Sequence, residues 1–412
     1  MKDVFSMMQA ASSKKNDLFV LIAGIAGLFI VMGIGRFAYT PILPLMVEST
    51  SLNNETAGYL ASSNYFGYFA GALLAGKLAW KKGKAYNVYF HLSLNIASTL
   101  LMGAAVNEFI WHLLRFLSGL TSGIIFVLIS SIVMDHLVRA GRAAWTGYLF
   151  SGVGLGILST GLLVPFLSNL FNWAGIWIAL GLLSFILALF IWKRLTETPS
   201  HETNVKKNPA VNNVTPPKTK SILPWLGAAY GLEGIGYIIS GTYLVALAAE
   251  IPVLQSNPSL SWVLVGAAAA PSCIIWSAAA SRIGNLTALQ AAFFLQILGV
   301  LFPVVFFNGI GALIGSFLFG ATFMGIVTMT IAEARNTAAG ESSSIIGGFT
   351  FIYSLGQMIG PIAAGLLISI TAELSASFYF AAAVLLTGMG CLGIAQALRR
   401  KHTEPKASNP SF

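Results

Sequence analysis

Long apolar runs constrain this chain more than any other feature. Windows of about 20 apolar residues recur along the sequence, each long enough to cross a bilayer as a helix. A water-facing helix would confine its apolar residues to one stripe, and a β-barrel would alternate them over segments of about ten residues. Only 9% of the residues are charged, against about 25% in soluble domains. The sequence therefore predicts an all-α integral membrane protein.

Polar breaks between the apolar runs predict twelve transmembrane helices. The expected spans cover about residues 18–47, 55–78, 86–106, 108–134, 143–167, 171–192, 222–250, 258–281, 286–307, 309–331, 344–370 and 374–398. Lys14 and Lys15 precede the first run as in a signal peptide, but the run is too long and leads straight into Arg36, so we expect a retained first span.

One long polar stretch divides the spans into two sets of six. Residues 193–221 contain four prolines, six basic side chains and no aromatic residue, a composition that cannot bury a core. We expect an N-terminal six-helix half at 1–192, a cytoplasmic linker at 193–221, a C-terminal half at 222–398 and a cytoplasmic tail at 399–412.

The basic residues predict the orientation of the spans. Every even-numbered span is followed by Lys or Arg, whereas the opposite loops carry glutamates and neither Lys nor Arg. The positive-inside rule then places both termini and the linker in the cytoplasm, as expected for a bacterial inner membrane. All 23 basic residues become cytoplasmic except Arg36 and Arg115. The net charge of +9 is thus explained without a nucleic-acid partner.

An internal repeat favours two related halves. A shift of 201 residues places Gly33, Ile34 and Gly35 on Gly234, Ile235 and Gly236. The same shift places Lys81 and Gly83 on Arg282 and Gly284, and Gly119 on Gly320. These matches fall at corresponding points of the expected spans and loops, as in two parallel repeats about an axis along the membrane normal.

Several motifs now carry a resemblance to the major facilitator superfamily. The stretch GKLAWKKGK, Gly76 to Lys84, resembles the family loop G-x-L-A-D-R-x-G-R, with Trp80 in place of the acidic residue. In that family the acid latches the loop to a neighbouring helix end. The resemblance implies a gating role for Gly76, Lys81, Gly83 and Lys84, and for Arg282 in the corresponding loop of the second half.

Three further stretches strengthen the resemblance. RFLSGLTSG, Arg115 to Gly123, is similar to the motif R-x-x-x-G-x-x-x-G, whose arginine is associated with proton coupling in many exporters. GQMIGPIAAG, Gly356 to Gly365, looks like the packing helices of the superfamily. GIGRFAYTPILPLM together with GLEGIGY resembles the YbfB/YjiJ-type branch of bacterial transporters.

Two arginines within apolar spans are the first candidate site residues. Arg36 lies about eighteen residues into the first span, where an arginine costs roughly 2.5 to 3.5 kcal/mol to insert. It is either an anion-binding or coupling residue in a central cavity, or a structural charge that is paired or extends outward past Tyr39. Arg115 lines the same cavity or lies at the interface near His112.

Glu233 is the only carboxylate deep within an expected span, about eleven residues from its start. Burial there favours the neutral form and allows reversible protonation. Three roles remain open: proton carrier, counter-charge to Arg36 across the cavity, or member of a purely structural ion pair. The shift of 201 residues aligns Tyr237 with Arg36, which adds Tyr237 to the candidates.

The remaining candidates are polar residues within spans and at their ends. Asn64, Tyr65, Gln290, Gln296, Tyr353 and Gln357 either line a polar cavity or form ordinary interhelical hydrogen bonds. Asp135 and Glu333 at cytoplasmic helix ends either form gate salt bridges or are solvated. The cysteines Cys273 and Cys391 lie in separate apolar runs and suggest no metal site or disulfide.

The expected function is therefore secondary active transport by alternating access. We expect proton coupling and a small organic solute bound between the halves, and the two arginines favour an anion. The partners are this solute, protons and the lipid bilayer; no cofactor, nucleic acid or oligomer is required. Export of amphipathic drugs is the alternative within transport, and a membrane-embedded sensor is the alternative outside it. No enzyme motif is present in the sequence.

Overall fold

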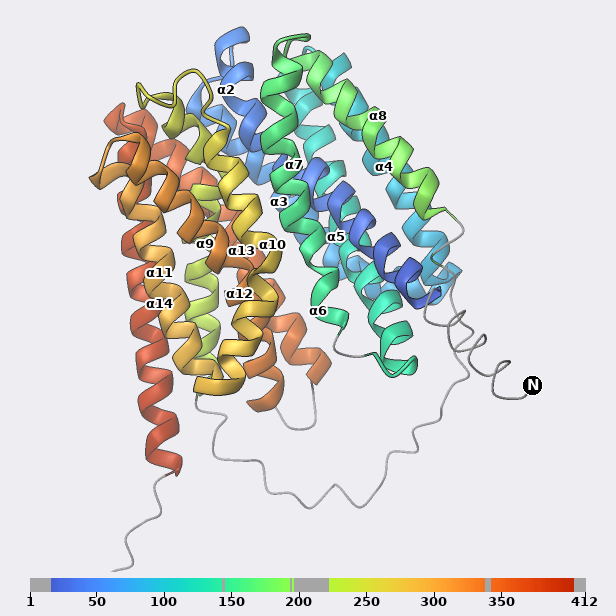
Figure 1. The fold of residues 1–412 in the computed structure, drawn as a ribbon, viewed down its shortest axis with the longest axis vertical. Coiled ribbons are helices and arrows are strands. Elements are labelled where there is room, and N and C mark those ends of the chain that lie inside the picture. Colours follow the sequence, from blue (N-terminus) through green and yellow to red (C-terminus); the bar gives the residue numbers. More distant parts are fainter. Residues whose placement is uncertain (1–15, 143–144, 193–194, 196–221, 338–341, 404–412) are drawn as a thin grey trace, which may run out of the picture.

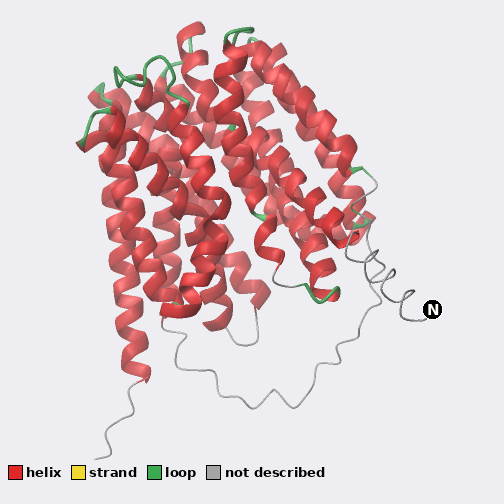
Figure 2. Cartoon of the chain, in the orientation of Figure 1, coloured by secondary structure: helices red, strands yellow, loops and turns green. Residues whose placement is uncertain are grey.

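A computed structural model describes residues 16–142, 145–192, 195, 222–337 and 342–403. The side chains of 76–82, 146, 342–347 and 401–403 lie outside this description. The described ranges form helices joined by short loops and contain no strand (Figure 2). The expectation of an all-α protein is confirmed.

The helices follow one another along the chain with short connections (Figure 1). Residues 16–28 are α-helical and continue into η1 (Phe29–Phe37), α2 (Tyr39–Ser49), α3 (Asn54–Lys82), α4 (Lys84–Ala104), α5 (Glu108–Arg139), α6 (Thr146–Leu149), α7 (Ser151–Ser168), α8 (Trp173–Ile191), α9 (Leu223–Ala249), α10 (Leu260–Ile283), α11 (Asn285–Val305), α12 (Gly309–Thr337), α13 (Ser342–Thr371) and α14 (Leu374–Thr403).

Within the described ranges, ten helices are long and apolar enough to cross a membrane, the first running over Asn16–Ser49. α3 and α4 occupy two further expected spans and have 29 and 21 residues. Several helices extend past the expected span ends. α5 continues to Arg139 and α12 to Thr337, because polar residues remain helical beyond the apolar segment.

The first long helix is irregular in its middle. η1 is a π-helix, a turn follows at Ala38, and regular α-helix resumes at α2. Pro41 has no backbone N–H to donate, so the i→i−4 ladder is interrupted there. A π-helical stretch leaves carbonyl oxygens that need other partners, and such stretches are frequent at functional sites.

Helix packing divides the described chain into two groups. η1 and α2 to α8 form one group of packed helices, and α9 to α14 form the other. The groups meet where α7 packs on α10, α3 on α13, and α2 on α9. Figure 1 shows the two groups side by side, with α2 at the top and α6 near the lower end of its group.

Three hydrogen bonds join the groups within the described residues, all near α2 and the start of α3. Thr40 Oγ1 donates to the carbonyl oxygen of Gly241. Tyr243 OH donates to that of Asn54 at 2.8 Å, and Ser62 Oγ to that of Met358 at 3.0 Å. The groups are therefore held together along α2 and the first part of α3.

Glycines mark equivalent contacts in the two groups. A Cβ at Gly119 would lie 1.8 Å from the carbonyl oxygen of Asn64, and one at Gly320 would lie 2.3 Å from that of Val265. Only glycine allows the helices to approach so closely. Gly119 and Asn64 lie 201 residues before Gly320 and Val265, respectively. The loop glycines Gly83 and Gly284, separated by the same 201 residues, have φ of 81° and 86°.

Candidate functional site

Arg36, in the last turn of η1, is surrounded by aromatic rings. Its side chain is buried, with 2% exposed. The guanidinium carbon lies 4.3 Å from the ring centre of Tyr68, 4.8 Å from that of Tyr65 and 5.3 Å from that of Phe37. Nε and Nη2 have no hydrogen-bond partner, and no carboxylate of the described residues forms a salt bridge with Arg36. The structure thus leaves a buried cation with free donors.

Arg115 is equally buried but donates to the backbone. Its Nη1 donates to the carbonyl oxygen of Gly35 at 3.0 Å and its Nη2 to that of Arg36 at 3.3 Å. The guanidinium carbon lies 4.7 Å from the ring centre of Tyr39. The structure therefore places Arg115 inside the helix bundle, against the π-helix that carries Arg36.

Two serines on the same face of α5 continue this contact. Ser118 Oγ donates to the carbonyl oxygen of Gly35, and Ser122 Oγ to that of Val31, both at 2.8 Å. Together with Arg115 they follow the i, i+3, i+7 spacing of one helix face. We call Arg115, Ser118 and Ser122 the α5 donor row. The sequence analysis missed the serines, although their spacing within RFLSGLTSG was a usable signal.

Asn95 of α4 supports the α5 donor row from behind. Its Nδ2 donates to the carbonyl oxygen of Ser118 at 3.0 Å and to Ser122 Oγ at 3.1 Å. A Cβ at Gly35 would lie 2.8 Å from Asn95 Oδ1, so glycine is required for η1 to approach this amide. The sequence analysis also missed Asn95, because its role depends on the contact between three helices.

Glu233 of α9 is fully buried, with 0% exposed. Its Oε1 accepts a hydrogen bond from Gln296 Nε2 at 3.1 Å, and its Oε2 has no donor. The structure does not bring Glu233 into a salt bridge with Arg36, so the two charges are not a direct ion pair here. Tyr237 lies one helical turn after Glu233 on α9 and stacks between Phe323 of α12 and Tyr353 of α13.

A stack of five aromatic rings passes beside Arg36. Along it, Phe319 lies 5.4 Å from Phe323, Phe323 5.7 Å from Tyr237, Tyr237 5.6 Å from Tyr353, and Tyr353 4.2 Å from Tyr230, between ring centres. All four interplanar angles are 16° or less. We call these rings the aromatic stack. They come from α9, α12 and α13. Phe37, whose ring lies against the Arg36 guanidinium, has its centre 6.5 Å from that of Phe323, so the stack of one group contacts the surroundings of Arg36 in the other.

The predicted polar residues divide between these features. Gln357 Nε2 donates to the hydroxyl of Tyr237 in the aromatic stack. Asn64 Nδ2 instead donates to the carbonyl oxygen of Arg115 at 2.9 Å, and Tyr39 OH to that of Ala57 at 3.0 Å. Asn64 and Tyr39 thus contact backbone near Arg115. Gln290, which bonds to the carbonyl oxygen of Met389, lies apart from these features.

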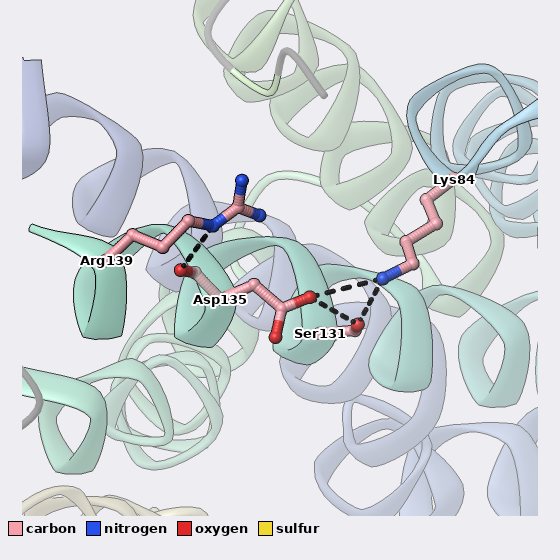
Figure 3. Close-up of polar contacts among 4 residues, drawn as sticks. All are labelled: Lys84, Ser131, Asp135 and Arg139. Atoms are coloured by element: carbon pink, nitrogen blue, oxygen red, sulfur yellow. Dashed lines mark hydrogen bonds and ion pairs between the residues drawn. The ribbon is translucent and has the colours of Figure 1, made fainter. Parts of the chain in front are cut away.

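The predicted gating residues lie at the end of α3, the start of α4 and the end of α10. Gly76 and Lys81 belong to α3, at positions whose side chains lie outside the described part. Gly83 ends this helix with positive φ. Lys84 Nζ donates to Ser131 Oγ at 2.7 Å and pairs with Asp135 Oδ2 at 3.2 Å (Figure 3). Arg282 is exposed.

Glu333 at the end of α12 is buried and pairs with Arg399 of α14. Both acidic residues singled out at these helix ends, Asp135 and Glu333, therefore take part in salt bridges. Each bridge joins helices of a single group, so in this conformation neither bridge connects the two groups.

Comparison with known proteins identifies the family. The family model described as "Uncharacterised MFS-type transporter YbfB" matches residues 28–392. The chain belongs to this family. It is accordingly a multi-pass membrane transporter of the major facilitator type and not an enzyme, as the motifs predicted.

Relatives and solved structures agree with this membership. An "Uncharacterized MFS-type transporter" of Yersinia pestis (strain Pestoides F) is 24% identical over 371 residues, covering 86% of this chain and 90% of the relative. A "Gentisate transporter" of Corynebacterium glutamicum is 26% identical over 138 residues, 33% of this chain and 31% of the relative.

Two solved transporters share the fold. A mutant of the nucleoside transporter NupG superposes with a TM-score of 0.72 at 12% identity, covering 94% of this chain and 100% of NupG. A bacterial homologue of the human lysosomal transporter Spinster, in an inward-facing and unoccupied conformation, gives a TM-score of 0.72 at 14% identity, covering 95% and 99%.

Proposed function

We propose that this protein is a proton-coupled secondary transporter of a small organic anion, working by alternating access. The observation that carries the proposal is Arg36, a buried cation whose Nε and Nη2 have no partner. A cation in a membrane interior is costly and marks a substrate or ion pathway when no protein group pairs with it. An anionic solute supplies the missing partner.

The proposed architecture has twelve spans in two halves, 1–192 and 222–398, joined by the linker 193–221. Two repeats related by a shift of 201 residues are supported by the equivalent helix contacts at Gly119 and Gly320. The similar positive φ angles of Gly83 and Gly284 support them as well. In such repeat transporters the substrate lies between the halves near the membrane midplane. Arg36 in one half and Tyr237 in the other meet this requirement.

Both termini and the linker lie in the cytoplasm of a bacterial inner membrane in this proposal. The basic residues at the linker end of the helices support this orientation. The hydrogen bonds of Thr40, Tyr243 and Ser62 then close the outer end. A rocking motion that breaks these three contacts would expose Arg36 to the outside, which is the alternating-access step.

Glu233 is the proposed proton carrier. Its carboxyl group is fully buried, one oxygen accepts a hydrogen bond from Gln296, and the other has no donor. A carboxylate in this setting is costly when ionised, so it exchanges a proton with water when the pathway opens. Glu233 lies one helical turn from Tyr237 of the aromatic stack, and Phe37 beside Arg36 contacts Phe323 of the same stack, which supports coupling between proton and anion.

The similarity to the gentisate transporter supports an organic anion as the solute, since gentisate is a carboxylate. That similarity covers a third of the chain, and Arg36 stands independently of it. Lys81, Lys84 and Arg282 are proposed to act in gating at the cytoplasmic ends of the helices, where Lys84 already pairs with Asp135.

Purified protein in proteoliposomes tests the proposal. A panel of small carboxylates is added outside, with a pH-sensitive dye inside and an imposed pH gradient. We expect carboxylate accumulation with proton movement in the wild type, and carboxylate exchange without proton movement in Glu233→Gln. Gln290→Ala removes an amide that donates to the carbonyl oxygen of Met389 on α14; it is the matched control and should transport normally.

Three outcomes contradict the proposal. Unchanged proton movement in Glu233→Gln would remove the proton carrier. Export of cationic amphipathic drugs with no carboxylate flux would favour a drug exporter. Carboxylate binding with no flux at all would favour a sensor.

A further inference from the structure

The free edge of Arg36 has a definite chemical shape. Nε–H and one N–H of Nη2 point in the same direction from a guanidinium plane, and this pair of donors matches the two oxygens of one carboxylate. These are the two Arg36 nitrogens without a partner. Arg36 therefore lacks one acceptor group with two oxygens that can bind both nitrogens at once.

Among the buried arginines of the described ranges, Arg36 alone has both nitrogens of such a fork without a partner. Arg115, the other buried arginine, already donates through Nη1 and Nη2 to the carbonyl oxygens of Gly35 and Arg36. Glu233 lies one helical turn before Tyr237 on α9, so it flanks the same aromatic stack. A second carboxylate on the solute would therefore meet no second free bidentate edge among the described interior arginines and would be repelled by Glu233 when that group is ionised.

The surroundings of this fork are aromatic. The rings of Tyr65, Tyr68 and Phe37 lie within 5.3 Å of the guanidinium carbon. On the facing group, Tyr237 lies between Phe323 and Tyr353 with interplanar angles of 5° and 6°. Parallel rings with centres 5.6 to 5.7 Å apart are spaced in the range for offset aromatic contact. A planar aromatic ring can stack face to face on these side chains, whereas a puckered aliphatic ring cannot make the same contact.

We propose that the solute is a planar aromatic monocarboxylate whose carboxylate binds the Nε and Nη2 edge of Arg36 while its ring packs against the aromatic stack beside Tyr237. This proposal rests on the proposed function and narrows its substrate class. The ring enters between the two groups of helices, because Arg36 belongs to one group and Tyr237 to the other. Binding therefore draws the two groups together around the solute.

Ligand binding to the full-length protein in detergent, measured by titration calorimetry, separates the features of the solute. Benzoate has the ring and the charge, cyclohexanecarboxylate has the charge and a puckered ring, benzamide has the ring without the charge, and succinate has two charges without a ring. We expect benzoate to bind about fivefold or more tightly than cyclohexanecarboxylate. Benzamide and succinate should bind weakest.

Variants of Tyr237 test the position of the ring. Tyr237→Leu should bring benzoate affinity down to that of cyclohexanecarboxylate, whereas Tyr237→Phe, which keeps the ring, should preserve the preference. Tyr379→Leu, which removes an exposed ring of α14, is the matched control and should bind as the wild type does. The wild-type ligand comparison remains decisive even where a Tyr237 variant does not fold.

Two results overturn the inference and are distinguishable. Equal affinity for benzoate and cyclohexanecarboxylate in the wild type would reject the aromatic solute and leave anion transport intact. Absence of binding by all the carboxylates, with Arg36→Gln indistinguishable from the wild type, would reject the anion site itself and with it the proposed function.

Discussion

The buried arginines Arg36 and Arg115 lie close together, yet the fold treats them in opposite ways. Arg115 donates through Nη1 and Nη2 to the carbonyl oxygens of Gly35 and Arg36, which the π-helix leaves available, and only its Nε lacks a partner. Arg36 is caged by rings, and two of its nitrogens remain unpartnered. Both pay the cost of burying a charge in a membrane. Arg115 therefore stabilises the backbone of η1, and Arg36 is available to bind a ligand.

This difference gives neighbouring residues of the same site different roles, one in stability and one in binding. The α5 donor row fixes the backbone of η1, and that backbone determines where the Arg36 side chain begins. Arg115, which the sequence analysis assigned to substrate or coupling, then acts on the solute through the position of Arg36. Variants of the two arginines should accordingly separate binding from stability.

Arg36→Leu should show the largest effect, and on binding alone. Losing a bidentate partner of a buried carboxylate costs about 100-fold or more in affinity. The free energy of unfolding should stay constant or rise by about 1 kcal/mol, because an uncompensated buried charge is replaced by an apolar side chain. Benzoate titration and thermal unfolding in detergent measure the two quantities. A strong loss of stability in Arg36→Leu would show that Arg36, like Arg115, stabilises the fold.

Arg115→Leu should show the reverse pattern. It removes the side-chain donor of the Arg36 carbonyl oxygen and leaves that of Gly35 with Ser118 Oγ alone. The loss of two charged hydrogen bonds in an apolar interior should lower the free energy of unfolding by about 3 kcal/mol. Affinity measured per folded molecule should fall far less than in Arg36→Leu. Arg115→Lys, which keeps one charged donor, should recover part of the stability. Stable folding of Arg115→Leu with complete loss of binding would instead make Arg115 a direct ligand.

Ser122→Ala removes one member of the α5 donor row and should have an intermediate effect. The carbonyl oxygen of Val31 loses its hydrogen bond at 2.8 Å, which corresponds to about 1 kcal/mol of unfolding free energy. The control is Ser93→Ala on the exposed face of α4, where the hydroxyl bonds only within its own helix. Equal unfolding curves for the two variants would show that η1 does not depend on this row.

Lys84→Ala should have the smallest effect on stability. The side chains of Lys84 and Asp135 are 35% and 51% exposed, and exposed ion pairs contribute about 0.2 to 1 kcal/mol. If the loop gates transport, the variant should change the rate of solute exchange while leaving benzoate affinity unchanged. Proteoliposome exchange rates measured beside binding separate these effects, and an unaltered rate would remove Lys84 from gating.

Much of the architecture was predictable from sequence because a bilayer imposes a length and a polarity on each span. The segments around Arg36 and Glu233 were recognised as helical and buried from their apolar surroundings alone. The breaks near Gly83 and Gly284 were also predictable, since a basic loop with glycine follows an apolar run in each case. The interruption of the first helix was not predicted, because a π-helix depends on neighbours that accept its free carbonyl groups.

The sequence by itself determined that Arg36 and Glu233 are charged residues of membrane-spanning helices, because hydropathy is a local property of the chain. Only the tertiary structure decided what each one meets. It gave Arg115 backbone carbonyls, Glu233 the amide of Gln296, and Arg36 aromatic rings without a counter-charge. Partners that lie tens of residues apart are chosen by helix packing, and close approach at glycines such as Gly35 and Gly119 sets that packing.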